Sequence, residues 1–166
     1  MQLLRLVVFV LAMAVASAGH AGVKIGFVNS SMLLERAPQA EAATAELEQE
    51  FADRERSIRQ AQQAIQELEA ELNRDAITMS ESDRSQKEQE INRKVRDLQR
   101  MQSNFRDDLN LRKNEELGRL QRLVLQAIRE VAQEQDYDLV LSEGVVYSAD
   151  RVDLTDAVLE QLGRMQ

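Results

Sequence analysis

The side chains that most often carry out catalysis or hold metals are nearly absent from this 166-residue chain. It has no cysteine and a single histidine, His20, which lies in an N-terminal segment that we expect to be removed. Without imidazole or thiol groups, histidine-based catalysis, His/Cys zinc sites and thiol chemistry are excluded from the remaining chain. We also find no glycine-rich phosphate loop, no G-x-S-x-G motif and no zinc signature. The sequence therefore predicts a protein that is not an enzyme and uses no metal or cofactor.

Carboxylates and basic side chains are the charged groups that remain. Glu67 and Glu71, or Glu115 and Glu116, lie close together in sequence, but on long helices such residues usually form a solvated face rather than a catalytic pair. The basic set is Arg93, Lys94, Arg96, Arg100, Arg106, Arg112 and Lys113. These side chains form either another solvated face or a patch for anionic lipid or a charged protein.

The first 21 residues have the pattern of a secretory signal peptide. Met1–Arg5 supplies one positive charge, Leu6–Ala16 is an unbroken apolar run, and the small residues of ASAGHA follow. We expect cleavage after Ala21 and a mature protein that works outside the cytoplasm. An uncleaved membrane anchor is the alternative, but a helix that spans a bilayer needs about 20 apolar residues.

The mature chain, residues 22–166, would be acidic. It has 20 basic and 29 acidic side chains and thus a net charge of −9. Such a surface repels nucleic acid, so we expect no nucleic-acid partner.

A heptad pattern follows the only proline, Pro38. Apolar residues recur at alternating steps of four and three, which is the period of a coiled-coil seam. The seam positions are Leu47, Phe51, Arg54, Ile58, Ala61, Ile65, Leu68 and Leu72. At Arg54, the one charged position, we expect the aliphatic stem to lie across the seam while the charge stays in water.

A second helical segment begins after a polar break. Ser80 with Asp83, or Ser85 with Glu88, can cap its first turn. Its seam positions are Ile91, Val95, Leu98, Gln102, Phe105 and Leu109 and, after a phase slip, Leu117, Leu120, Val124, Ala127 and Val131. The two helices are predicted to form an antiparallel hairpin with a turn near residues 74–81. The apolar stripe widens beyond Leu117, which indicates packing against more than one neighbour.

Short strand patterns flank this hairpin. Residues 23–28 and 137–141 have the composition of strands, and so do residues 145–148, with Gly144 at a predicted β-hairpin turn between the last two. A closing helix follows from Asp153. Because the helical hairpin returns the chain to the point where it left, the first strand can pair with the later strands.

The predicted fold is therefore α+β, with a long antiparallel α-helical hairpin inserted in a small β-strand body. We call residues 38–135 the arm, and residues 22–37 and 136–166 the body. A body of about 45 residues rarely buries enough apolar area alone. Because no disulfide can help it, we expect the bodies of several identical chains to join through their edge strands.

Several apolar residues of the arm lie off the seam or near its irregular points. Ile77 and Met79 are near the hairpin turn, Met101 is off the seam, and Leu111 is close to the phase slip. They are either an adaptable surface for unfolded chains or ordinary scattered apolar residues. These two interpretations fit the residues equally well.

The assembled pattern resembles the Skp (OmpH) family of periplasmic chaperones over essentially the whole chain. The similar segments are VKIGFVNSSMLLERAP, the turn SDRSQKEQEI and the long stretch from FRDDLNLRKNEELGRL to DYDLVLSEGVVYSADRVDLTDAVLEQL. The most specific pieces are the first strand with its short helix and the stretch from NEELGRL to DYDLVL.

The resemblance implies a periplasmic homotrimer whose three arms enclose a cavity that holds unfolded outer-membrane β-barrel proteins without ATP. Residues from about 50 to 115 would line the cavity. The side chains that would build the trimer body are Val23, Ile25, Phe27, Leu139, Leu141, Val145 and Tyr147. The candidate client contacts are Ile77, Met79, Met101, Phe105 and Leu111.

One departure from the family concerns charge. The well-studied members are basic, and their arms are thought to attract acidic clients and lipopolysaccharide, whereas this chain is acidic. The basic positions that are proposed to bind lipopolysaccharide in the family are matched only in part here, by Arg112 and Arg119, with Lys113 beside Arg112. We therefore expect little contact with lipopolysaccharide or membranes. A second class of function fits the residues as well, namely a structural or adaptor protein whose coiled coil binds one folded envelope-assembly partner.

Overall fold

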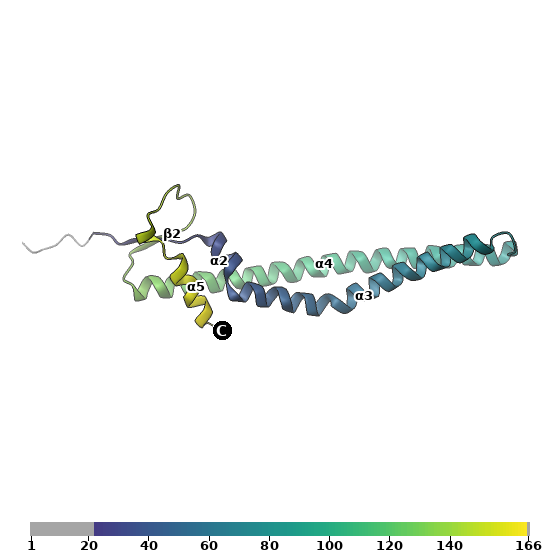
Figure 1. The fold of residues 1–166 in the computed structure, drawn as a ribbon, viewed down its shortest axis with the longest axis horizontal. Coiled ribbons are helices and arrows are strands. Elements are labelled where there is room, and N and C mark those ends of the chain that lie inside the picture. The colour runs from purple at the N-terminus through teal and green to yellow at the C-terminus, as the bar shows by residue number, and fades with distance from the viewer. Residues whose placement is uncertain (1–21, 166) are drawn as a thin grey trace, which may run out of the picture.

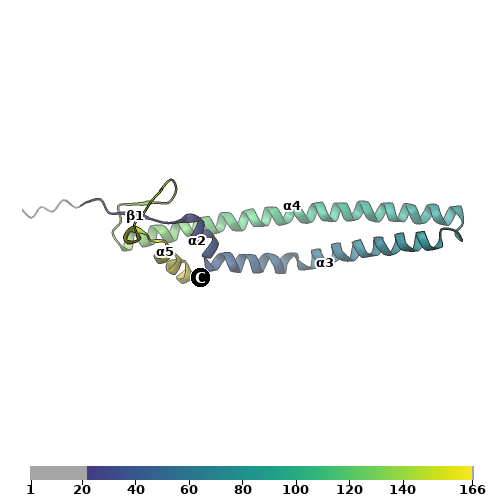
Figure 2. The same cartoon turned by 45° about the horizontal axis from the view of Figure 1, so that its top comes forward.

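The computed structural model describes residues 22–165, and the predicted signal peptide lies outside the described residues. Figure 1 shows a small body at one end and a long helical hairpin that projects from it, and Figure 2 shows the same arrangement from a second side. The elements in chain order are β1 (Ile25–Phe27), α2 (Ser30–Arg36), α3 (Pro38–Asp75), α4 (Glu81–Glu134), β2 (Leu139–Leu141), the short 3-10 helix η1 (Asp150–Val152) and α5 (Thr155–Arg164). The predicted α+β class and the inserted hairpin are confirmed.

The two arm helices begin where the sequence indicates. Pro38 occupies the first turn of α3, where its missing N–H costs nothing. Ser80, not Ser85, caps α4, because its Oγ accepts the N–H of Asp83 at 3.1 Å and donates to Oδ2 of Asp83 at 2.7 Å. With 38 and 54 residues, the helices are roughly 57 and 81 Å long at 1.5 Å per residue.

The heptad seam joins α3 to α4 along the arm. Phe51 and Ile65 of α3 and Ile91 of α4 are buried there. Arg54 extends across the seam as predicted, and its Nη1 donates to Oδ2 of Asp108 on α4 at 2.6 Å. About half of the Arg54 side chain stays exposed, so its charge remains in contact with water.

The hydrophobic core lies where the base of α4 meets α2 and α5. Leu33, Val158 and Leu162 are fully buried in it. Four side chains of α4 also belong to this core, namely Leu120, Val124, Ala127 and Val131. The wide apolar stripe at the base of α4 therefore packs against two neighbouring helices, as its width predicts.

The end of α4 directs the chain into β2. Asp136 has a positive φ of 54°, a conformation that Asp tolerates better than most residues. The N–H of Tyr137 then donates to the carbonyl of Ala132 at 2.8 Å, which is the backbone pattern of a Schellman motif.

β1 pairs with β2 in parallel, with Ile25 opposite Leu139, Gly26 opposite Val140 and Phe27 opposite Leu141. The first strand thus finds its partner on the far side of the inserted arm. Because side chains alternate along a strand, Gly26 and Val140 share the face that meets the core, and the other residues of both strands share the opposite face.

The predicted third strand, residues 145–148, is wrong, and so is the β-hairpin that was to contain it. These residues form no strand, although Gly144 does turn the chain with a φ of 75°. The second edge of β1 is taken instead by the segment before α5, since the N–H of Leu154 donates to the carbonyl of Phe27 at 2.8 Å. A short strand without a partner or a face to pack against is not stable, and Val146 and Tyr147 are almost fully exposed.

The lack of a side chain at Gly26 allows the sheet to lie close to the core. A Cβ built on Gly26 would lie 2.6 Å from Cδ1 of Leu154 and 3.2 Å from Cδ1 of Tyr137. We therefore expect Gly26→Ala to lower the free energy of unfolding by about 1–3 kcal/mol, as overpacking does. Urea unfolding followed by circular dichroism measures this change. Gly163→Ala, where an added Cβ meets nothing within 4 Å, is the control, and equal stability of the two variants would contradict the prediction.

Candidate functional site

The outer face of the small sheet is an exposed apolar surface. It contains Val23, which is 67% exposed, together with Ile25, Leu139 and Leu141, which are 40–45% exposed. We call these four residues the outer face. Tyr147 is also exposed, whereas Phe27 and Val145 are half-buried. Clustered exposed apolar side chains of this kind usually mark a contact with another molecule.

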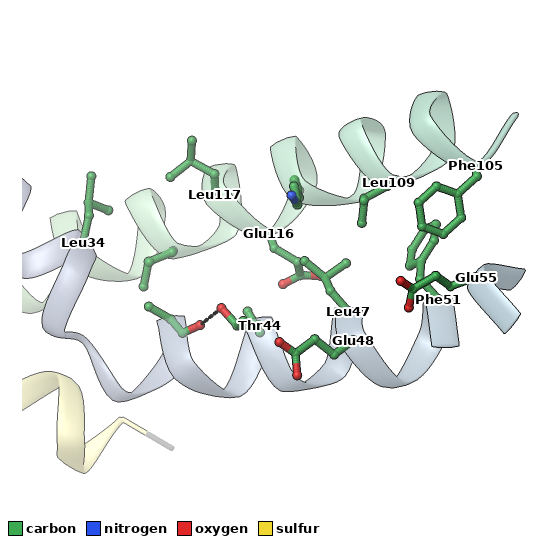
Figure 3. A pocket seen from close by; sticks show the side chains of 14 residues that line it. Leu34, Thr44, Leu47, Glu48, Phe51, Glu55, Phe105, Leu109, Glu116 and Leu117 are labelled. Atoms are coloured by element: carbon green, nitrogen blue, oxygen red, sulfur yellow. Dashed lines mark hydrogen bonds between the residues drawn. The ribbon is translucent and has the colours of Figure 1, made fainter. Parts of the chain in front are cut away.

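A groove of about 880 Å³ lies between α3 and α4 at the base of the arm. We call it the arm-base groove. Figure 3 shows Phe51 and Phe105 at one end and Leu34 of α2 at the other, with Leu47, Leu109 and Leu117 between them. The ring centroids of Phe51 and Phe105 are 5.6 Å apart in an edge-to-face arrangement, which is favourable for aromatic pairs.

The groove follows from the phase slip in α4. Continuing the seam beyond Leu109 at steps of three and four leads to the charged residues Arg112 and Glu116. Glu116 lines the groove, and so does Lys113, which follows Arg112. On α3 the lining residues Ala40, Ala43 and Thr44 are small. Polar residues opposite small ones cannot fill the space between the helices, so the seam stays open there. The slip was visible in the sequence, but the groove was not predicted from it.

A second hollow of about 480 Å³ lies farther along the arm. Ile58, Met101 and Phe105 contribute its apolar lining, and Arg54 and Asp108 are among its polar residues. Met101 and Phe105 are therefore half-buried parts of hollows rather than isolated surface residues.

The other candidate contact residues are spread along the arm. Ile77 is 97% exposed at the hairpin turn, Leu111 is 58% exposed near the base, and Met79 is half-buried. The structure does not gather the five predicted residues into one patch. Their role in binding remains a prediction.

The three basic candidates have different surroundings. Arg112 donates to Glu115 at 2.7 Å and to Glu50 of α3 at 3.2 Å, and Glu116 lies 3.3 Å away. The hydrogen bonds to Glu115 and Glu50 raise the pKa of Arg112 above its usual value. This guanidinium is thus already engaged by carboxylates, which makes it a poor open site for an anionic lipid.

Ion pairs also link the helices elsewhere along the arm. Lys87 of α4 lies 2.7 Å from Glu71 of α3, and this hydrogen bond and the charge of Lys87 lower the pKa of Glu71. Surface pairs of this type add little stability each. The Glu71–Lys87, Arg54–Asp108 and Arg112–Glu50 pairs all join α3 to α4, and together they favour one register between the two helices.

The aromatic pair that closes the groove should stabilise the arm locally. Phe51 is only 5% exposed, so Phe51→Ala should lower the local stability of the arm by about 3 kcal/mol. Hydrogen exchange of the α3 amides measures this effect, and protection of the body helices should stay unchanged. Phe51→Leu, which keeps most of the apolar volume, should cost less than half as much. Equal exchange in the two variants would show that Phe51 does not hold the seam closed.

Within residues 22–165, no helix is long and apolar enough to cross a membrane. The described residues also contain no group of three or more potential metal ligands. What the fold presents instead is an apolar face on a small body and a long, hollowed helical arm. These features define a class of binding protein that combines a coiled-coil arm with a small body that has an exposed apolar face.

Comparison with known proteins gives the family within that class. The family described as outer membrane protein (OmpH-like) matches residues 24–162, and the chain belongs to this family. The chain is 30% identical over 153 residues to the chaperone protein Skp of Pectobacterium atrosepticum, covering 92% of this chain and 93% of that protein. It is 30% identical over 154 residues to the chaperone protein Skp of Escherichia coli K12, covering 92% and 94%.

A solved structure has the same fold. The OmpH-like outer membrane chaperone of Caulobacter crescentus CB15 superposes with a TM-score of 0.78, at 19% sequence identity, over 89% of this chain and 88% of that one. The resemblance found in the sequence is thereby confirmed.

Proposed function

We propose that this protein is a periplasmic, ATP-independent holdase chaperone that binds unfolded outer-membrane β-barrel proteins and prevents their aggregation. The observation that carries the proposal is the hollowed, partly apolar arm on a chain of the OmpH-like family. Relatives that match nearly the whole chain are named as chaperones. Residues 1–21 would act as the cleaved signal peptide that brings the protein to the periplasm.

The working form in this proposal is a homotrimer joined through the body. The outer face offers apolar side chains that a single chain leaves exposed. Phe27 of β1 would extend this contact, and so would Val145 and Tyr147, because residues 142–149 form no strand or helix in their own chain. Burying such a face against identical copies removes apolar area from water and gives edge strands a partner. The three arms would then surround a cavity.

Client capture in the cavity would rest on many weak contacts. Ile77, Met79, Met101, Phe105 and Leu111 are the candidate client contacts, and they are distributed from the hairpin turn to the base of the arm. Distributed sites raise the overall avidity while each contact can still exchange quickly. Release would need only a more favourable acceptor, namely the membrane into which the client inserts. Because apolar contacts are not screened by salt, protection should persist at high ionic strength.

Charge should contribute less in this protein than in a basic relative. Arg112 is engaged by three carboxylates, and Arg119 lies 3.8 Å from Glu116. Of the three basic candidates, Lys113 is the one for which the described residues show no ion pair within 4 Å. We therefore expect lipopolysaccharide and anionic vesicles to bind weakly.

A light-scattering experiment tests the proposed function. Urea-unfolded outer-membrane barrel protein is diluted into buffer with and without the mature chain, and the mass of the chaperone is measured on the same sample. We expect suppression of aggregation at close to one trimer per client. A stable oligomer without any protective effect would overturn the proposal and favour an adaptor that binds one folded partner.

A further inference from the structure

The arm-base groove is an apolar hollow that coiled-coil packing leaves open. Its volume of about 880 Å³ falls within the range of roughly 300–1,000 Å³ that is typical of ligand pockets. Leu109, Leu117 and Leu120 of α4 and the small residues of α3 form its floor. Leu117 is 46% exposed, so this floor can be reached from solvent.

The dimensions of the groove fit an extended peptide segment. On α3 the lining residues run from Ala40 to Glu55, which is roughly 22 Å at 1.5 Å per residue. An extended chain rises about 3.3 Å per residue, so about seven residues would span this length. Because side chains alternate along an extended chain, three or four of these seven would point toward the floor of the groove.

The rims of the groove are charged, and the charges are of both signs. Glu55 contacts Arg59 at 2.9 Å, and Glu116 contacts Arg112 at 3.3 Å. Glu48 on α3 and Lys113 on α4 also line the groove, and no ion pair within 4 Å joins either to another residue in the described part of the chain. One carboxylate and one ammonium group are thus available on opposite rims of an apolar floor.

We propose that this groove binds an extended client segment in which apolar and polar side chains alternate. Alternation places apolar side chains on the floor and leaves polar ones at the rims, where Glu48 and Lys113 can pair with charges of either sign. Segments with this period are the building units of transmembrane β-barrels. The inference rests on the proposed function and adds that each arm holds client segments between its own two helices.

The chain itself allows a clean binding measurement, because it has neither cysteine nor tryptophan. Thr44→Cys places a bimane label in the groove, and Ala45→Cys places it on the adjacent exposed position, which lines no hollow described above. The probes are two nine-residue peptides of identical composition, each with one tryptophan, either alternating or with the apolar residues in one block. Tryptophan quenches bimane only at close range.

The alternating peptide should quench the label at position 44 and not at position 45. The block peptide should need a roughly ten-fold higher concentration, which corresponds to about 1.4 kcal/mol. Ala43→Phe, which fills the groove, should weaken quenching at position 44 by a similar factor, whereas Ala45→Phe on the same helix should not. Equal quenching by the two peptides, equal quenching at both positions, or no effect of Ala43→Phe would overturn the inference. Displacement of the peptide by lower concentrations of palmitate would overturn it too, because it would assign the groove to acyl chains.

Light scattering on the unlabelled chain separates this inference from the proposed function. If the chain protects unfolded barrel protein but the groove shows no peptide preference, only the inference fails. If the chain gives no protection at all, the proposed function fails, whatever the groove binds.

Discussion

Replacing Ile25 by glutamate should dissociate the proposed trimer into single chains and abolish its protection of unfolded clients. Ile25 belongs to the outer face and is 43% exposed in the single chain. In a symmetric trimer, the substitution would bring three carboxylates into the apolar contact. Burying an unpaired charge costs several kcal/mol per ion, so the substitution should strongly disfavour association. Without the trimer, the arms no longer surround a common cavity.

Light-scattering mass and the aggregation assay measure the two effects on the same samples. Ile25 is not among the buried residues of the core, so the helices of the single chain should still form, and circular dichroism verifies this. Ile25→Leu and Ala45→Glu are the controls. The first keeps the face apolar, and the second adds the same charge to an exposed position of the arm. A trimer that persists in Ile25→Glu would show that the outer face is not the subunit contact.

Shortening the arm should weaken client protection while the proposed trimer remains intact. Deleting residues 59–72 and 88–101 takes two heptads from each helix, so the seam keeps its phase and the turn capped by Ser80 stays in place. Each leg loses roughly 21 Å. The proposed cavity becomes shallower, and the second hollow loses Met101 from its lining. We expect the concentration needed for half-maximal protection to rise about ten-fold, because fewer weak contacts act together.

A length-matched chain identifies which property of the arm is required. In it, the two deleted segments are replaced by regular heptads with polar surfaces. Protection that returns with length alone assigns the effect to cavity depth, and protection that stays lost assigns it to the original side chains. If the shortened chain protects clients as well as the full-length protein, the arms are not the binding element and the proposed function is wrong.

The amino-acid sequence alone determined the arm. The steps of four and three from Leu47 to Leu72 predict α3, and the cap at Ser80 with Asp83 predicts the start of α4; the structure confirms both. Such signals are local, because helix period and capping depend on residues within one or two turns. The pairing of β1 with β2 was also predictable, since the hairpin returns the chain to its starting point.

Tertiary structure alone decided the features that depend on distant or absent partners. Residues 145–148 have a strand composition, yet they form no strand in the single chain, and the segment before α5 occupies the second edge of β1. The arm-base groove depends on how small residues of α3 face Lys113 and Glu116 across the seam. The contact of Arg112 with Glu50, two residues 62 positions apart in sequence, likewise depends on the register of α3 and α4. Sequence period fixes which residues share a face, whereas the packing of two faces fixes which of them meet and what space remains between them.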